Sequence, residues 1–524
     1  MAGSQEKIDE RPVSETVESP EKFDNQNNEI AVFEEIDPAE EKALVRKLDH
    51  VIMPLMAAVY FFQYTRSANK SIQPDLDKGS INYAAVFGLK DDLKLSGEEF
   101  SWVVSLFYLG QLASEYPAAY ILSRFHITIF VGATIVAWGA VEMSIGATQD
   151  FHGLAAARFF LGFAEAAVSP AFVIITSNWY RRSEHPIRVA TWISMNGISQ
   201  IVGALLMYAV GGADMAIESW RAIFLVFGGL TVACGGAFVL LMPRDTTNAW
   251  FLTEREREVA TRRLAIDRAT RDRAHFDKKQ MWEALSSPLT WLYFMMALCI
   301  TLTTPILKFS SLVINGFGFT KFRTMLVGLP GGAINFTTVW VSALVPRFFP
   351  GTRVYTAIGL TLVPLAGSTI LLALPVDANG GASWGIVAST WLAACSSAPL
   401  CACAGLMASN VKGNTKKSIV SAGFFITYCV GCIVSPQAWQ QADAPRYTKG
   451  CMLSIASWVA MIVTLVIYLV LIKRKNRIRN EKASEGRPEY LSGSQLGEGS
   501  HTQLGVSVDS DLTDLGDKGF RYST

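Results

Sequence analysis

Long apolar runs separated by short polar breaks recur about a dozen times between Val51 and Ile472. Five of these runs are Ile127–Thr148, Val189–Gly211, Ala222–Met242, Val354–Leu374 and Met452–Ile472. Each has about 20 residues, the length that an α-helix needs to cross a hydrocarbon core of roughly 30 Å. A soluble domain does not contain so many uninterrupted apolar runs. The pattern therefore predicts an all-α membrane protein with about twelve transmembrane helices.

The longest polar break, Pro243–Pro288, divides the runs into six and six, and the two halves share local patterns. Lys78 and Lys308 each stand ten residues before the glycine of a Phe-Gly pair. The second helix of each half ends in an Arg-Phe pair, at Arg124 and at Arg347. These repeats indicate two pseudo-symmetric six-helix bundles.

We expect five parts along the chain. They are a disordered acidic tail (1–46), an N-terminal bundle (47–242), a central loop (243–289), a C-terminal bundle (290–473) and a second disordered tail (474–524). The central loop, which is the third part, contains a charged helix that begins after a capping Thr253.

Lysine and arginine in the short loops predict the orientation of the chain. One set of loops and both outer ends of the helical region are basic: Arg46, Lys47, Arg124, Arg181, Arg182, Arg188, Arg347, Arg353, Lys412, Lys416, Lys417, Lys473, Arg474 and Lys475. The opposite loops are acidic, as at Asp91, Asp150, Asp214 and Asp377. Basic loops stay in the cytoplasm, so we expect both tails and the central loop there.

Several functional classes lack their motifs. The first forty-odd residues contain no apolar stretch of a cleavable signal peptide. Cys429 and Cys432 are best explained as two small packing residues of one helix, and the six histidines show no paired spacing for haem or metal. Nucleotide-binding, nucleophile-elbow and zinc-hydrolase motifs do not occur. We therefore expect no enzyme, and no metal, cofactor or nucleic acid as a partner.

Several motifs together resemble those of fungal allantoate permease-like transporters, in the anion:cation symporter branch of the major facilitator superfamily. The motifs are Asp77–Leu89, Arg158–Gly162 followed by Glu165-Ala166-Ala167, Trp179–Arg182, Trp220-Arg221 with Phe224, Phe251–Glu254 and Asn410–Lys417. The resemblance covers about residues 40–480. It implies the major facilitator fold and a secondary active transporter. Relatives carry small organic anions, vitamins and nitrogen-rich metabolites such as allantoate, nicotinate, pantothenate or biotin, together with protons.

The sequence departs from this family pattern in two places. The usual loop motif between the second and third helices is reduced to Ser123–His126. In addition, Thr65–Asp75 separates Tyr64 from Leu76, which follow each other directly in relatives. The preceding run, Val51–Tyr64, would rise only about 21 Å as a helix, too little to span a bilayer. Thr65–Asp75 is either retained intron sequence or a real re-entrant bulge.

Charged residues within the runs are candidates for function, because burying a charge in a membrane is costly. Arg158, Gly162, Glu165 and Ser169 recur at helical spacing and predict one polar stripe on the fourth helix. Arg158 offers a planar fork for a carboxylate, and Glu165 is a protonatable partner two turns away. The alternative is a structural ion pair that holds this helix to a neighbour.

Further candidates lie on other helices. Lys78 and Asn82 share a face of the first helix, and Lys308 is the counterpart of Lys78 in the second half. Both lysines either balance an anionic substrate or extend to the membrane surface. Glu115 on the second helix is the other candidate proton carrier.

Neutral polar residues complete the candidate set. Asn196, Gln200, Asn335 and Tyr428 either hydrogen-bond the substrate or bridge helices. The lysines of Asn410–Lys417 are expected to anchor and gate the cytoplasmic side.

These residues predict a proton-coupled symporter for a small organic anion that works by alternating access. We expect the lipid bilayer as surroundings, the plasma membrane as location and trafficking machinery as a partner of the tails. The competing interpretations are a nutrient sensor that keeps the fold without transport, and a membrane-embedded enzyme, which the missing motifs disfavour.

Overall fold

A computed structural model describes residues 37–65, 89–181, 184–211, 217–269, 277–304, 321–374, 384–393, 395–439, 448–485, 487, 490 and 512–524. The regular elements in this part of the chain are helices. They are α1 (Pro38–Thr65), α3 (Leu89–Asp92), α4 (Gly97–Arg124), α5 (Ile127–Ile145), α6 (Phe151–Glu165), α7 (Val168–Trp179), α8 (His185–Gly211), α9 (Ser219–Leu241), α10 (Glu254–Ala269), α11 (Lys278–Ser286), α12 (Pro288–Leu302), α14 (Lys321–Phe348), α15 (Arg353–Ala373), α16 (Trp384–Ala393), α17 (Ser397–Asn410), α18 (Asn414–Val434), the 3₁₀ turn η1 (Ser435–Ala438) and α19 (Thr448–Ser484).

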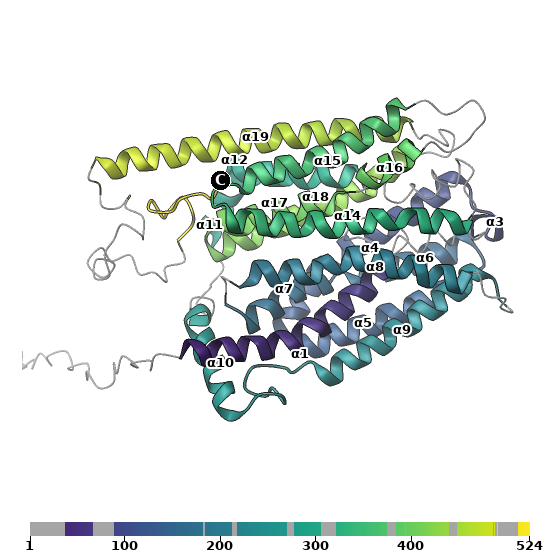
Figure 1. Cartoon of the computed structure of the whole chain (residues 1–524), viewed down its shortest axis with the longest axis horizontal. Helices are drawn as coiled ribbons and strands as arrows, with labels where there is room; N and C mark the ends of the chain where they lie inside the picture. The colour runs from purple at the N-terminus through teal and green to yellow at the C-terminus, as the bar shows by residue number, and fades with distance from the viewer. Residues whose placement is uncertain are drawn as a thin grey trace, which may run out of the picture.

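The helices form two bundles, which occupy the upper and lower halves of Figure 1. Within the described residues, nine spans are long and apolar enough to cross a membrane, or ten if the bent pair α11–α12 counts as one. Two broken helices, α6–α7 and α16–α17, each count as one of these spans. Helices α1 and α4, both 28 residues long but with polar ends, bring the N-terminal bundle to six. The bent pair α11–α12 brings the C-terminal bundle to six. The predicted all-α, two-bundle fold is confirmed.

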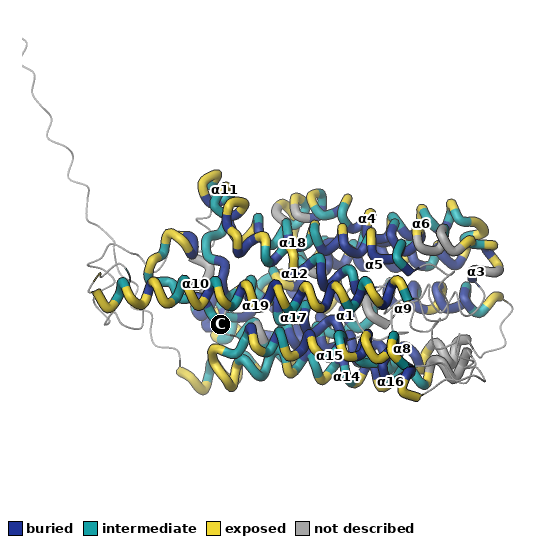
Figure 2. The backbone as a smooth tube through the Cα atoms, turned by 90° about the horizontal axis from the view of Figure 1, so that it is seen from above, coloured by how far each residue is buried: buried dark blue, intermediate teal, exposed yellow. Residues whose placement is uncertain are grey.

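Helix α19 shows why an apolar helix can keep an apolar outer face. Trp458, Leu465 and Tyr468 point into the C-terminal bundle and are buried. Val463 and Val470 face outwards and are 52% and 59% exposed. Exposed positions recur along α19 in Figure 2. Exposed apolar surface of this extent is costly in water but not against lipid tails, so this face is suited to the bilayer interior.

Glycines set the spacing within the N-terminal bundle. A Cβ atom added at Gly162 of α6 would lie 1.9 Å from the carbonyl oxygen of Phe107 on α4. One added at Gly110 of α4 would lie 2.0 Å from the carbonyl oxygen of Phe159 on α6. The two backbones therefore touch, as small residues allow at helix crossings in membranes.

The two ends of the bundles differ, and we name them by nearby helices. The α10 end contains α10, α11 and the residues Leu512–Thr524; the opposite α3 end contains α3 (Figure 1). At the α10 end, the predicted cap of the central helix is confirmed, because Thr253 Oγ1 accepts from the Glu256 amide at 3.4 Å. Glu256 also pairs with Lys47 of α1 at 2.7 Å, which ties the central loop to the N-terminal bundle.

The predicted disordered tails need correction at their inner borders and at residues 512–524. Helix α1 begins at Pro38, within the predicted N-terminal tail, and α19 continues to Ser484, which places eleven residues of the predicted C-terminal tail in this helix. Residues Leu512–Thr524 pack on the C-terminal bundle, with Asp514 only 2% exposed. Gly, Ser and charge content predicts disorder for a segment taken by itself. It does not reveal that Asp514 and Asp517 form ion pairs with Lys416 and Lys412 of the folded bundle.

The segment Thr65–Asp75 lies outside the described residues except for Thr65, the last residue of α1. Both interpretations of this segment stay open.

Contacts between the bundles lie at the α3 end and near mid-height. At the α3 end, Ser105 Oγ of α4 donates to the carbonyl oxygen of Ile433 on α18 at 2.9 Å. Near mid-height, α8 packs along α14, where a Cβ atom at Gly197 would lie 2.7 Å from the carbonyl oxygen of Gly332. The bundles are thus joined at one end and cross closely at their middle.

Candidate functional site

Two broken helices occupy equivalent places in the bundles. The fourth span of the N-terminal bundle breaks between Glu165 and Val168, and the fourth span of the C-terminal bundle breaks between Ala393 and Ser397. A proline follows each break, at Pro170 and at Pro399. Proline has no N–H to donate four residues back, so a helix tends to break there. The two helical segments on either side of each irregular turn still count together as one span.

Arg158 and Glu165 lie on the same face of α6 and are 0% and 1% exposed. Their seven-residue spacing separates them by about 10 Å along the helix axis. Glu165 is the last residue of α6, directly at the break. Ser169 lies on α7, beyond the irregular turn at 166–167, and the continuation of the stripe to this residue stays a prediction. Arg158 and Glu165 form the charged part of the candidate site.

Helix α4 places further polar groups opposite α6. Both helices run in the same direction, and the contact of Gly162 with Phe107 and Gln111 fixes their register. Gln111 is 6% exposed and faces this contact. The register places Glu115, which is half-buried, within about one turn of Glu165 along the bundle axis. The two predicted proton carriers therefore lie at similar depth on neighbouring helices.

Asn196 and Gln200 lie on α8 and are buried. The Asn196 amide donates to Ser397 Oγ at 3.1 Å, directly at the break between α16 and α17. Gln200 Nε2 donates to Asn196 Oδ1 at 2.9 Å. Asn196 thus bridges the two bundles, as the alternative interpretation of this residue predicts, and it does so at the edge of a broken helix.

Asn335 and Tyr428 are buried polar residues of the C-terminal bundle. Asn335 is 0% exposed and lies one turn from Gly332, where α14 crosses α8. Neither its Oδ1 nor its Nδ2 has a hydrogen-bond partner among the described residues, and neither has Tyr428 Oη. Gln200 Oε1 and Ser396 Oγ are buried without a described partner as well. Burying an unpaired polar group is costly, so a group of such atoms is suited to a polar ligand or water.

Three predicted site residues, Lys78, Asn82 and Lys308, lie outside the described residues. Their assignment as substrate ligands stays a prediction.

Sequence reasoning missed Glu142 and the helix breaks. Glu142 lies on α5, inside the apolar run Ile127–Thr148, and is 1% exposed. A carboxylate in such a run is itself a signal of function or of a buried partner. The breaks were also readable, from Pro170 and Pro399 inside long apolar runs.

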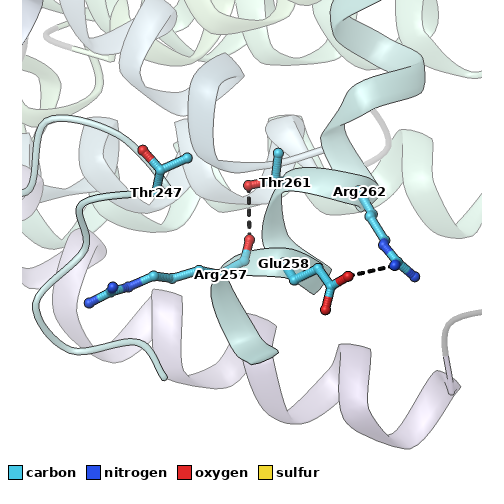
Figure 3. A pocket seen from close by; sticks show the side chains of 5 residues that line it. All are labelled: Thr247, Arg257, Glu258, Thr261 and Arg262. Atoms are coloured by element: carbon cyan, nitrogen blue, oxygen red, sulfur yellow. Dashed lines mark hydrogen bonds and ion pairs between the residues drawn. The ribbon is translucent and has the colours of Figure 1, made fainter. Parts of the chain in front are cut away.

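A separate hollow lies away from this site, at the α10 end. It is lined by Thr247, Arg257, Glu258, Thr261 and Arg262, from α10 and the loop before it (Figure 3). Glu258 and Arg262 pair with each other there. The hollow is an open surface feature of the central loop, outside the two bundles, and we do not assign the substrate to it.

Comparison with known proteins identifies relatives over most of the chain. The sequence model of the Major Facilitator Superfamily matches residues 75–436. The transporter C417.10 of Schizosaccharomyces pombe, which is described as uncharacterized, is 32% identical over 495 residues, 94% of this chain and 91% of that protein. The allantoate permease of Saccharomyces cerevisiae is 29% identical over 523 residues, 98% and 91% of the two chains. The thiamine pathway transporter THI73 of the same yeast is 28% identical, with 91% and 86% covered.

Solved structures show the same fold at low sequence identity. A bacterial homologue of the human lysosomal transporter Spinster has a TM-score of 0.55 and 13% identity, with 80% of this chain and 96% of that chain covered. The xylose transporter XylE from E. coli has a TM-score of 0.57 and 12% identity, with 79% and 98% covered.

Proposed function

Because the chain belongs to the major facilitator superfamily, we propose that it is a proton-coupled symporter for a small organic anion. The cargo class is a carboxylate such as a vitamin or a nitrogen-containing metabolite. The observation that carries this proposal is the fully buried Arg158, two turns from the equally buried Glu165 at a helix break. A guanidinium group binds a carboxylate through two parallel hydrogen bonds, and a nearby glutamate is able to take up a proton.

Further observations support an anionic cargo. One relative is an allantoate permease, and allantoate is a carboxylate. The unpaired amide of Asn335 and the hydroxyl of Tyr428 offer hydrogen bonds to the polar remainder of such a molecule. We assign Arg158 to the carboxylate, and Asn335, Tyr428, Gln200 and Asn196 to its orientation. Lys78, Asn82 and Lys308 complete the proposed substrate set.

Coupling to a proton follows from electrostatics. Moving one elementary charge across a membrane costs about 2.3 kcal/mol per 100 mV. An anion that enters a cell with a negative interior must pay this cost, and a proton carried with it removes the net charge. Protonation of Glu165, or of Glu115 at similar depth, weakens the attraction between that carboxylate and the Arg158 guanidinium. The guanidinium is then available to the substrate.

Alternating access is the proposed mechanism. The bundles are joined at the α3 end through Ser105 and Ile433. The excess of basic residues at the α10 end supports a cytoplasmic location for that end, together with both tails and the central loop. With the outer end joined, the site is reached from the cytoplasm. Rocking of the bundles about the crossing of α8 and α14 would open the site to the other side.

Uptake into cells tests this function directly. Cells that express the chain receive a panel of labelled carboxylates at acidic and at neutral outside pH, with and without a protonophore. Acid-stimulated uptake of one carboxylate that the protonophore abolishes would support the proposal and identify the cargo. Surface expression at the plasma membrane without any uptake would favour a nutrient sensor with this fold. Uptake of a carboxylate at the same rate at acidic and neutral outside pH would contradict coupling to a proton.

A further inference from the structure

The residues Leu512–Thr524, which we call the docked segment, bind the C-terminal bundle at the α10 end. The segment reaches five elements that are far away in the sequence: α11, α15, the end of α17, the start of α18 and the end of α19. In Figure 1 the C-terminal mark lies beside these helices. The segment therefore occupies a surface to which several parts of the C-terminal bundle contribute.

Lys416 is the centre of this surface. Its side chain is 3% exposed and pairs with Glu283 of α11 and with Asp514 of the docked segment, both at 2.7 Å. The Asp514 side chain is equally buried, at 3% exposure. A buried lysine that holds one acid from the bundle and one from the segment makes a specific site, because an unpaired charge there would be costly. Lys412 pairs with Asp517 in the same region.

Aromatic and backbone contacts fix the rest of the segment. Tyr522 is buried and its hydroxyl donates to Asp514 Oδ2 at 2.7 Å. Burial and the Asp514 carboxylate both raise the pKa of Tyr522 above its ordinary range, so the phenol stays a donor. Asn410 holds the backbone of Ser523 through two hydrogen bonds, and Arg479 donates to the carbonyl oxygen of Asp514.

The Thr513 hydroxyl lies directly against the carboxylate of Glu283. Thr513 is 5% exposed, and its Oγ1 donates to Glu283 Oε2 at 2.8 Å. The same hydroxyl accepts from the Gly516 amide at 3.0 Å. The methyl group of Thr513 also fills the space over Gly413, where an added Cβ atom would lie 3.0 Å from Thr513 Cγ2. The hydroxyl is thus a donor to a carboxylate, with the Asp514 carboxylate on the next residue.

We propose that Thr513 is a phosphorylation site that controls whether the docked segment binds the C-terminal bundle. The terminal phosphoryl group of a nucleoside triphosphate passes to Thr513 Oγ1, the nucleoside diphosphate leaves and the hydroxyl proton is released. Because Thr513 is buried in the docked state, the transfer takes place on the released segment. The reaction needs a cytoplasmic kinase, so it rests on the orientation proposed above and not on the identity of the cargo.

The phosphoryl group prevents docking for two physical reasons. It adds between about −1.5 and −2 charges at neutral pH, next to the carboxylates of Glu283 and Asp514. It also replaces the hydroxyl hydrogen through which Thr513 donates a hydrogen bond to the Glu283 carboxylate. The phosphate and the carboxylate then form a like-charge contact. Lys416, already paired with both acids, would have to neutralise a third anion.

Peptide binding tests this proposal without a transport assay. The receptor is a purified variant of the chain that ends at Val508, in detergent. The probes are fluorescent synthetic peptides of residues 509–524: unmodified, phosphorylated on Thr513, or phosphorylated on Ser523. The Ser523 peptide is the matched control, because it carries the same added charge on a residue that Asn410 holds by its backbone. Fluorescence anisotropy gives the three dissociation constants.

We expect the unmodified and Ser523-phosphorylated peptides to bind within threefold of each other, and the Thr513-phosphorylated peptide at least tenfold more weakly. Equal weakening by both phosphates, binding of the Thr513 phosphopeptide within twofold of the unmodified peptide, or no binding of the unmodified peptide would overturn the proposal.

Hydrogen–deuterium exchange on the full chain gives a second test if the shortened receptor does not fold. Thr513→Glu should increase the exchange rate of the amides of residues 514–523 at least tenfold, whereas Ser523→Glu should leave it within threefold. Equal rates in the two variants would contradict a switch at Thr513.

Discussion

At the residue scale, Asn335 separates a binding role from a structural one. Its amide is fully buried, and neither polar atom has a described partner. Leaving a buried polar group unpaired costs about 1–3 kcal/mol. We therefore expect Asn335→Leu to keep or raise the thermal stability of the purified protein, while uptake falls at least fivefold.

Asn196→Leu is the matched control, because Asn196 is paired with both Gln200 and Ser397. It should lower stability by about 1–2 kcal/mol, since two hydrogen bonds are lost. Thermal unfolding followed by tryptophan fluorescence measures both variants. If Asn335→Leu destabilised the protein as much as Asn196→Leu and left uptake unchanged, Asn335 would be a structural residue.

Glu165 and Glu115 are distinguished by neutralising each in turn. Gln resembles a protonated carboxyl at every pH, so a proton carrier replaced by Gln no longer responds to a pH gradient. We expect Glu165→Gln to lose pH-driven accumulation but to retain exchange of internal for external substrate. Glu115→Gln, on a half-buried position, should retain both. Loss of coupling in Glu115→Gln alone would transfer the role to Glu115.

Single residues could be chosen from the sequence because charge inside an apolar run is rare. This reasoning identified Arg158 and Glu165, whose burial the structure shows. It overlooked Glu142, although the same rule applies to it. The sequence does not reveal that Asn196 has hydrogen-bond partners while Asn335 has none among the described residues. Both are asparagines in apolar runs, and a hydrogen bond between helices distant in sequence appears only in the fold.

At the element scale, the contact of α4 with α6 depends on two glycines. A Cβ atom at Gly162 would lie 1.9 Å from a backbone oxygen of α4, and backbone cannot move aside as a side chain can. Gly162→Ala should therefore lower stability by about 3 kcal/mol or more, which is the upper range for overpacking. Gly236→Ala on α9 is the matched control, since the described part of the chain has no atom within 4 Å of its added Cβ, and it should be nearly neutral.

Thermal unfolding of both alanine variants, with their yield after purification, measures the difference. Equal stability of Gly162→Ala and Gly236→Ala would contradict the direct backbone contact between α4 and α6.

The helices themselves were predictable from the sequence, because their length and apolar content follow the bilayer thickness. Their breaks were not predicted, although Pro170 and Pro399 gave the signal. The docked segment was beyond such reasoning for another reason. Thr513 and Glu283 are 230 residues apart, and the tertiary fold alone brings them together. Amino-acid composition predicts whether a segment folds by itself, but it does not predict whether the segment binds a surface formed by other parts of the chain.

At the scale of the whole molecule, the family resemblance read from short motifs is confirmed by relatives that cover most of the chain. The expectation of a transporter rather than an enzyme follows from that family. Two helical bundles, each with a proline near an irregular turn in its fourth span, are compatible with the alternating access proposed above.

In the alternating access that we propose, the two bundles rock about the crossing of α8 and α14. A Cβ atom at Gly332 would lie 2.9 Å from the carbonyl oxygen of Gly197. We expect Gly332→Ala to reduce the maximal uptake rate at least fivefold, because it forces the two helices apart at the pivot. Gly328→Ala lies one turn earlier on α14, where no atom of the described residues is within 4 Å of the added Cβ, and it should be neutral. Uptake kinetics at matched surface expression measure both, and equal rates would contradict a pivot at this crossing.

The most direct test of proton-coupled anion transport uses the purified protein in liposomes. A pH gradient, acidic outside, is imposed while valinomycin and equal potassium concentrations hold the membrane potential at zero, and entry of the labelled carboxylate found in cells is followed. Proton-coupled symport predicts that the labelled carboxylate transiently accumulates inside the liposomes above its outside concentration. This accumulation should disappear when the pH gradient is removed and in the Glu165→Gln variant. Entry that only equilibrates the label, at the same rate with and without the gradient, would contradict proton-coupled symport.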